Sequence, residues 1–186
     1  MKRLILGGVK SGKSRYAERL VASWASQSGN SNRAVIYLAT AEQRDGDEEL
    51  GKRIALHKAQ RPPTWKTIEE PVKIADIIET VSGKSQCILV ECLTLWVSNL
   101  LQDETHIAQG INHLCKVLET YEGEIILVSN ETGLGIMPAN ELARRFGDEV
   151  GVLHQRLAAI CDEVVLTIAG LPHHLKTKKR NYDLDG

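Results

Sequence analysis

A short glycine-rich segment, Gly7–Ser14, constrains the fold of this chain more than any other feature. It reads Gly-Gly-Val-Lys-Ser-Gly-Lys-Ser and matches the pattern G-x-x-x-x-G-K-[ST] in full. The apolar run Leu4–Leu6 precedes it, and an amphipathic stripe from Ala17 to Trp24 follows it. The sequence therefore predicts a buried strand, a tight loop and a helix, which together form the first β-loop-α unit of an α/β protein.

Apolar runs that resemble strands alternate along the chain with stripes that resemble helices. Strands are expected at Ala34–Leu38, Trp65–Ile68, Cys87–Val90, Glu124–Val128 and Val164–Ile168. This alternation predicts a mostly parallel sheet with helices on both faces. Together with the glycine-rich segment, it predicts an α/β fold of the P-loop NTPase (RecA-like) type.

The chain has the length of one domain. Residues 1–186 are therefore expected to form a single P-loop nucleotide-binding catalytic domain, with a tail, 173–186, that is loose or forms an edge strand. Pro71 suits the first turn of a helix that ends near Gly83. A long helical stripe over Leu142–Cys161 is expected to be broken near Gly147.

Charge and cysteine usage exclude several classes of protein. The chain has 23 Lys and Arg against 24 Asp and Glu, so it lacks the basic excess of a nucleic-acid-binding domain. Its four cysteines form no CxxC pair, which argues against a disulfide framework or zinc site. No apolar run approaches the roughly 20 residues that span a membrane. We expect a cytoplasmic protein with no nucleic-acid partner and no membrane span.

The residue types of the glycine-rich segment suit a nucleoside triphosphate. Glycines let backbone N–H groups converge on phosphates, and the N-terminus of the following helix adds its positive end. Lys13 can reach the β- and γ-phosphates, and the Ser14 hydroxyl can ligate Mg²⁺. The predicted phosphate-binding residues are Gly7, Gly8, Val9, Lys10, Ser11, Gly12, Lys13 and Ser14.

A magnesium site of this kind also needs an acidic residue at the carboxyl end of a buried strand. Glu91, directly after Cys87–Val90, is the first candidate. Glu131, which follows the strand Glu124–Val128 after two polar residues, is the alternative. The sequence leaves both open.

One histidine lies in a cationic segment that is unusual for a plain helix and turn. His57 is followed by Lys58 and Arg61, and Pro62 and Pro63 then end the helix. An imidazole there can attack a phosphorus centre while the cations offset the phosphate charge. Composition alone favours an ordinary surface histidine.

Several motifs, taken in order, resemble the bifunctional adenosylcobinamide kinase/adenosylcobinamide-phosphate guanylyltransferase family of cobalamin biosynthesis. The resemblance extends from Leu4 to about Gly170. It rests on five segments, namely the loop Gly7–Ser14, the strand end Tyr37–Thr40, the block Arg53–Glu69, the strand end Val90–Thr94 and the segment Val128–Pro138.

The resemblance implies two reactions on one nucleotide-binding architecture. ATP or GTP would phosphorylate a hydroxyl of adenosylcobinamide, and His57 would then carry GMP from GTP to adenosylcobinamide phosphate, giving adenosylcobinamide-GDP. It also implies a homotrimer, with Mg²⁺ held by Ser14 and Glu91 and with Lys13 acting beside His57 in catalysis. The nucleotide contacts implied beyond the loop are Ala39, Thr40, Ala41, Lys58, Ala59, Gln60, Arg61, Glu69 and Glu91.

Two other functions compete with this interpretation. One is a P-loop small-molecule kinase without guanylyltransferase activity, in which His57 has only a structural role. The other is a RecA-like DNA-binding or motor module, which the near-neutral charge and the lack of an aromatic-basic stripe disfavour.

Overall fold

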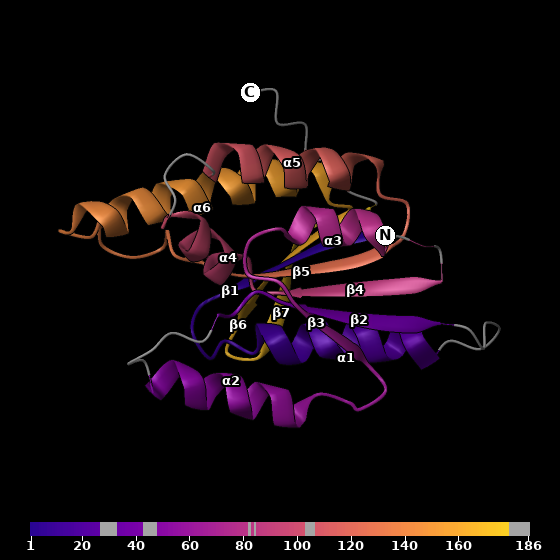
Figure 1. The fold of residues 1–186 in the computed structure, drawn as a ribbon. Coiled ribbons are helices and arrows are strands. Elements are labelled where there is room, and N and C mark those ends of the chain that lie inside the picture. The colour runs from indigo at the N-terminus through magenta and orange to yellow at the C-terminus, as the bar shows by residue number, and fades with distance from the viewer. Residues whose placement is uncertain (27–32, 43–47, 82, 84, 103–106, 179–186) are drawn as a thin grey trace.

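Seven strands form one sheet in the order β3-β2-β4-β5-β1-β6-β7 (Figure 1). The computed structural model describes residues 1–26, 33–42, 48–81, 83, 85–102 and 107–178, without the side chains of residues 49, 50, 53, 57 and 60. The strands are β1 (Lys2–Gly7), β2 (Ala34–Ala39), β3 (Lys66–Glu69), β4 (Gln86–Glu91), β5 (Glu124–Asn130), β6 (Glu163–Ile168) and β7 (Leu171–Lys176).

Every neighbouring pair of strands is parallel except β6 and β7, which are antiparallel. The helices described are α1 (Lys13–Ser26), α2 (Glu48–Gln60), α3 (Ile74–Thr80), α4 (Leu93–Leu100), α5 (Ile107–Thr120) and α6 (Glu141–Ile160). The predicted α/β fold with a mostly parallel sheet is confirmed, and the start of the tail forms the edge strand β7.

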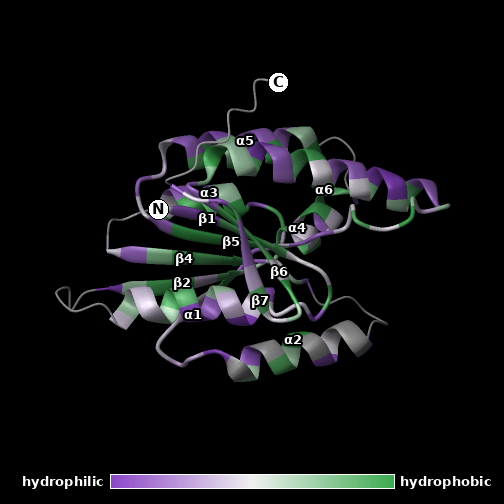
Figure 2. Ribbon diagram, turned by 180° about the vertical axis from the view of Figure 1, so that it is seen from behind, coloured by the Kyte–Doolittle hydropathy of each residue, from purple (hydrophilic) through white to green (hydrophobic). Residues whose placement is uncertain are grey.

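The sheet separates two apolar layers. Alternate residues of the central strands face opposite ways: Leu4 and Leu6 contribute to one buried cluster, and Ile5 contributes to the other. Helices α3, α4, α5 and α6 cover the first face, while α1 and, further out, α2 lie on the second (Figure 1). Figure 2 shows the central strands as the most hydrophobic part of the ribbon, as expected for a sheet buried on both faces.

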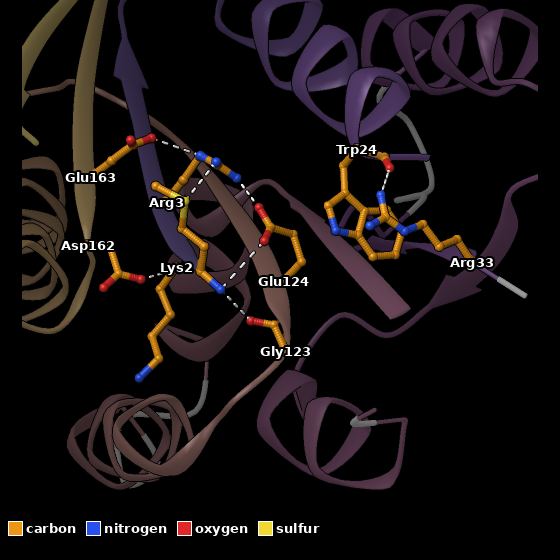
Figure 3. A network of polar contacts seen from close by, with 9 residues as sticks. Lys2, Arg3, Trp24, Arg33, Gly123, Glu124, Asp162 and Glu163 are labelled. Atoms are coloured by element: carbon orange, nitrogen blue, oxygen red, sulfur yellow. Dashed lines mark hydrogen bonds and ion pairs between the residues drawn. The ribbon is translucent and has the colours of Figure 1, made fainter. Parts of the chain in front are cut away.

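Charged groups tie together the amino-terminal ends of the central strands (Figure 3). Arg3 on β1 donates from Nε to Glu163 on β6 at 2.8 Å and pairs through Nη1 with Glu124 on β5. The Lys2 amide donates to Asp162 at 2.7 Å. These pairs fix the register of three adjacent strands at their amino-terminal ends. The loops at the opposite, carboxyl ends of the strands form the site described below.

Two predicted helix details are wrong. Helix α3 begins at Ile74 rather than at Pro71, because the Glu70 carboxylate accepts the amides of Val72 and Lys73 and holds this segment in a turn. Side chains of α4 also hold the turn, since Trp96 donates to the Val72 carbonyl at 2.7 Å. The helix ends at Thr80, before Gly83.

Helix α6 runs unbroken through Gly147. The Asn140 side chain caps its first turn by accepting the Ala143 amide at 3.1 Å, and Lys176 of β7 donates to the carbonyls of Ala158 and Ala159 at its other end. Its buried face and these caps outweigh the roughly 1 kcal/mol that a helical glycine costs. None of the helices described here is both long and apolar enough to cross a membrane.

Candidate active site

The loop between β1 and α1 folds tightly around Ser11. The Ser11 amide donates to the Gly8 carbonyl at 3.2 Å, and the Tyr16 amide donates to Gly12 at 2.9 Å as the helix begins. Lys10 and Gly12 have positive φ angles of 56° and 95°. Only glycine adopts the second value without strain, which explains the glycine at that position of the pattern.

Residues at the end of β6 and in the turn into β7 contact this loop and stabilise it. The Thr167 hydroxyl is buried, lies 2.9 Å from the Ser11 hydroxyl and donates to the Leu6 carbonyl at 3.1 Å. The Gly170 amide donates to the Ser11 carbonyl at 2.9 Å. A Cβ atom at Gly7 would clash with both Thr167 and Ser11. The shape of the loop therefore depends on residues almost 160 positions away.

Glu91, at the end of β4, accepts a hydrogen bond from the Ser14 hydroxyl at the start of α1. Its second oxygen, Oε2, is buried and has no hydrogen-bond partner among the residues that the structure describes. Burial raises the pKa of the Glu91 carboxyl, while the Ser14 hydroxyl and the cations Lys13 and Arg61 oppose that rise. A buried carboxylate oxygen without a partner, beside a serine hydroxyl, suits a bound cation.

The carboxylate of Glu131, the alternative acid, contacts other groups. Its Oε1 accepts the Gly133 amide at 2.7 Å, and its Oε2 lies 3.9 Å from Nδ1 of His154. Of the two acids, Glu91 is the one that contacts Ser14, so the geometry favours Glu91 as the partner of the loop.

A cavity of about 820 Å³ extends from the glycine-rich loop to helix α2. Arg61, just after α2, stacks its guanidinium carbon 3.9 Å from the ring centre of Tyr37. Lys58 pairs with Glu69 of β3 at 2.5 Å. These two contacts join the carboxyl end of α2 to strands β2 and β3 across the cavity.

Most of the residues predicted to bind the nucleotide line this cavity. They are Val9, Lys10, Ser11, Gly12, Lys13, Ser14, Ala39, Ala41, Lys58, Arg61, Glu69 and Glu91. Gly7, Gly8 and Ala59 are not among its lining residues. His57 lies in α2 between two lining residues, Leu56 and Lys58, and its side chain, like that of Gln60, is outside the described part of the structure.

Thr40 is buried behind the cavity. Its hydroxyl donates to the Cys92 carbonyl and accepts the Cys92 amide, both at 2.8 Å, and its carbonyl accepts from Asn99. The Thr40 side chain thus holds the chain just after Glu91, which positions that carboxylate.

Sequence reasoning missed several residues of the site, and Tyr37, Asn130 and Thr167 are three of them. Tyr37 and Asn130 line the cavity, and Thr167 supports the loop. Tyr37 and Asn130 each lie at or next to the carboxyl end of a predicted strand, which is the signal that could have drawn attention to them. Thr167 offered no such signal beyond being a polar residue in an apolar strand.

Comparisons with known proteins agree with this geometry. Residues 3–175 match the family model described as cobinamide kinase/cobinamide phosphate guanyltransferase. The bifunctional adenosylcobalamin biosynthesis protein CobP of Pseudomonas aeruginosa is 49% identical over 95% of this chain and 98% of its own length. The corresponding CobU proteins of Escherichia coli and Salmonella typhimurium are 34% and 36% identical over 95% of this chain and 100% of theirs.

A solved structure of a protein from Pyrococcus horikoshii shares the fold. It is 8% identical, with a TM-score of 0.50, and the match covers 96% of this chain and 87% of that one. At this identity the likeness concerns the fold alone.

Proposed function

The chain belongs to the cobinamide kinase/cobinamide phosphate guanyltransferase family, and on that premise we propose that a single cavity serves both of its reactions. The enzyme phosphorylates cobinamide and transfers a guanylyl group to cobinamide phosphate, as a bifunctional enzyme of cobalamin biosynthesis. We assign the phosphate-binding role to Gly7–Ser14 and the role of nucleophile in guanylyl transfer to His57.

One observation carries this proposal: the glycine-rich loop and helix α2 line the same cavity. Lys13 and Ser14 lie on one wall, and Leu56 and Lys58, which flank His57, lie on another. The volume of about 820 Å³ is within the usual range for small-molecule sites. A nucleotide whose phosphates lie along the loop would extend toward the helix that carries the histidine.

The kinase step needs positioning and charge neutralisation more than covalent chemistry. ATP or GTP would bind with its phosphates on the backbone of the loop, and Lys13 would reach the β- and γ-phosphates. The acceptor oxygen of cobinamide then forms a bond to the γ-phosphorus as the bond from that phosphorus to the β-phosphate oxygen breaks.

In guanylyl transfer, a nitrogen of neutral His57 would attack the α-phosphorus of GTP. The N–P bond forms as the bond to the pyrophosphate oxygen breaks, and Lys58 and Arg61 offset the negative charge. An oxygen of cobinamide phosphate then attacks the same phosphorus and displaces the imidazole, which regenerates the free enzyme.

We propose that Ser14 and Glu91 hold Mg²⁺. A hydroxyl and a carboxylate are oxygen ligands of the kind that this ion prefers, and within the described part of the chain the buried Oε2 of Glu91 has no hydrogen-bond partner. When bound, the ion would neutralise phosphate charge and stabilise the leaving oxygen.

Labelling with GTP that carries radioactive α-phosphorus tests the role of His57. We expect label that survives denaturation, is acid-labile and alkali-stable, and is absent from His57→Ala. His173→Ala, which alters an exposed histidine of β7, is the matched control and should label like the wild type. Failure of the folded, GTP-binding wild type to take up label would refute the histidine intermediate.

We further propose that the enzyme is a cytoplasmic homotrimer. Its four cysteines are free and buried, as in a reducing compartment.

Between β5 and α6, and on the first turn of α6, several large apolar side chains are strongly exposed: Leu134, Ile136, Met137 and Leu142. Exposed apolar side chains grouped in this way are typical of protein contacts. Light scattering of the wild type and of Ile136→Lys tests this, with a smaller species expected for the variant.

A further inference from the structure

We propose that Glu131 accepts the proton of the acceptor hydroxyl in the kinase reaction, and that His154 is the residue that positions its carboxylate. The proposal rests on the proposed function in one respect, which is that the phosphates of the donor bind along Gly7–Ser14. It assigns a role to the acid that does not contact Ser14, and it identifies the general base of the kinase step.

Glu131 is close in space to the glycine-rich loop. Strand β5 lies directly beside β1, with Asn130 opposite Gly7, and the Glu131 amide donates to the Gly7 carbonyl at 3.0 Å. Glu131 therefore lies next to the start of the glycine-rich loop. The Lys13 ammonium group donates to the Gly8 carbonyl at 3.3 Å. Because this lysine reaches the β- and γ-phosphates in such loops, the γ-phosphate end of the site is near Gly8, next to Glu131.

Glu131 is also accessible to a large substrate. The Glu131 side chain is 21% exposed, so an incoming hydroxyl can reach it. The preceding residue, Asn130, lines the nucleotide cavity, and its buried Oδ1 atom has no hydrogen-bond partner in the regions that the structure describes. Asn130 and Glu131 thus supply two acceptor groups at consecutive positions where β5 ends, and the first of them lines the cavity.

Neighbouring groups hold the Glu131 carboxylate in place. Oε1 accepts the Gly133 amide at 2.7 Å, and Oε2 lies 3.9 Å from His154 Nδ1, which is longer than a hydrogen bond. The other ring nitrogen of His154 lies 2.7 Å from the hydroxyl of Ser129, and both of these residues are buried. Contacts of catalytic groups are often long before the substrate binds and tighten in the complex.

His154 can orient Glu131 without neutralising it. Burial lowers the pKa of the His154 imidazole, and the charge of Glu131 only partly offsets that effect. The ring is therefore neutral near pH 7 and does not form an ion pair that would offset the charge of the carboxylate. A charged carboxylate is what a proton acceptor requires.

The two acids then have separate roles. Glu91, buried and bonded to Ser14, acts on the metal side of the phosphates, and Glu131 acts on the side of the acceptor. As the hydroxyl oxygen bonds to the γ-phosphorus, its proton passes to Glu131 and the bond to the β-phosphate oxygen breaks. Glu131 later releases the proton to water.

Glu131→Gln in the full chain tests the proposal, because the amide has the same shape and cannot accept the proton. We expect kcat of the kinase reaction, measured with cobinamide and ATP labelled at the γ-phosphorus, to fall about 10²- to 10⁴-fold. The Kd for GTP and the α-phosphorus label on the protein should stay within about threefold of wild type. A fall in kcat of less than threefold would overturn the proposal, as would a parallel loss of kinase activity, GTP binding and label.

This design separates the failure of the proposal from failure of the proposed function. The latter would appear in the wild type, as absence of the protein-bound label, and the former appears only in the comparison of Glu131→Gln with the wild type.

A second pair of variants tests His154. His154→Asn keeps a group that hydrogen-bonds to Ser129 and should retain kcat within about threefold, whereas His154→Leu should lose at least tenfold in kcat with an unchanged KM for the nucleotide. Equal kcat values for the two variants would refute the positioning role. If His154→Leu does not fold, Ser129→Ala takes its place with the same expectation.

Discussion

Removal of the Thr167 hydroxyl should destabilise the phosphate-binding loop without creating a cavity. Thr167→Val keeps the shape of the side chain but removes its contacts with the Ser11 hydroxyl at 2.9 Å and the Leu6 carbonyl at 3.1 Å. Thr167 is 1% exposed and Ser11 is 9% exposed, so water cannot readily replace the lost partner. A buried polar group without a partner costs about 1–3 kcal/mol. We therefore expect a loss of about 2 kcal/mol in the free energy of unfolding.

For a chain of this size, about 2 kcal/mol lowers Tm by roughly 4–8 °C. Urea unfolding and calorimetry measure the loss, and titration with GTP measures the expected decrease in nucleotide affinity, since Ser11 belongs to the loop. Thr167→Ser, which keeps the hydroxyl, is the control and should lie close to the wild type in GTP affinity. The reasoning is refuted if Thr167→Val unfolds and binds GTP like the wild type, or if Thr167→Ser binds GTP as weakly as Thr167→Val.

Three further substitutions test other parts of the site. Gly12→Ala places a Cβ atom on a residue with a φ of 95°, at 3.0 Å from the backbone of the β6–β7 turn. Urea unfolding should therefore show a loss of at least about 1 kcal/mol in the free energy of unfolding. Gly8→Ala, where the space around the added Cβ is open, is the control and should show little change. Arg61→Ala removes the stack on Tyr37 and should weaken GTP binding by about 1–2 kcal/mol in calorimetric titration; unchanged affinity would contradict a role for the stack in the site. Burial lowers the pKa of His154 below its ordinary 6.5, so the unfolded state binds more protons than the folded state. The free energy of unfolding of the wild type should therefore fall by up to about 1.4 kcal/mol per pH unit as the pH falls below 6.5. His154→Asn should lack this decrease. An identical pH dependence of urea unfolding in the variant and the wild type would contradict a contribution from His154.

The fold could be predicted because its signals are local. Apolar runs of the right length gave β1, β4 and β5, and the pattern at Gly7–Ser14 placed the loop between a strand and a helix. The errors concern the ends of α3 and the break expected near Gly147 inside α6. Pro71 was assigned to a helix because proline suits a first turn, but Glu70 and the side chains of α4 compete for the same backbone groups. Such tertiary contacts override local preference.

The candidate site was predictable where a motif identifies residues, and unpredictable where three-dimensional packing brings them together. The loop, Glu91 and the segment around Lys58 line one cavity, as expected from their motifs. The stack of Arg61 on Tyr37 and the brace of Thr167 under Ser11 join residues 24 and 156 positions apart, and no spacing rule connects them. Sequence also left Glu91 and Glu131 as alternatives, because it cannot show which acid meets the Ser14 hydroxyl.

The two edges of the sheet have a consequence for the behaviour of the protein at high concentration. Strand β3 has only four residues and begins with Lys66, and β7 contains Pro172, which has no N–H group to offer an incoming strand. Short strands, lysine and proline at sheet edges oppose the pairing of strands from different molecules, which is the route to fibrillar aggregates. Crowding should therefore not drive copies of this chain to join through their backbones, and contact between copies is directed to side-chain surfaces.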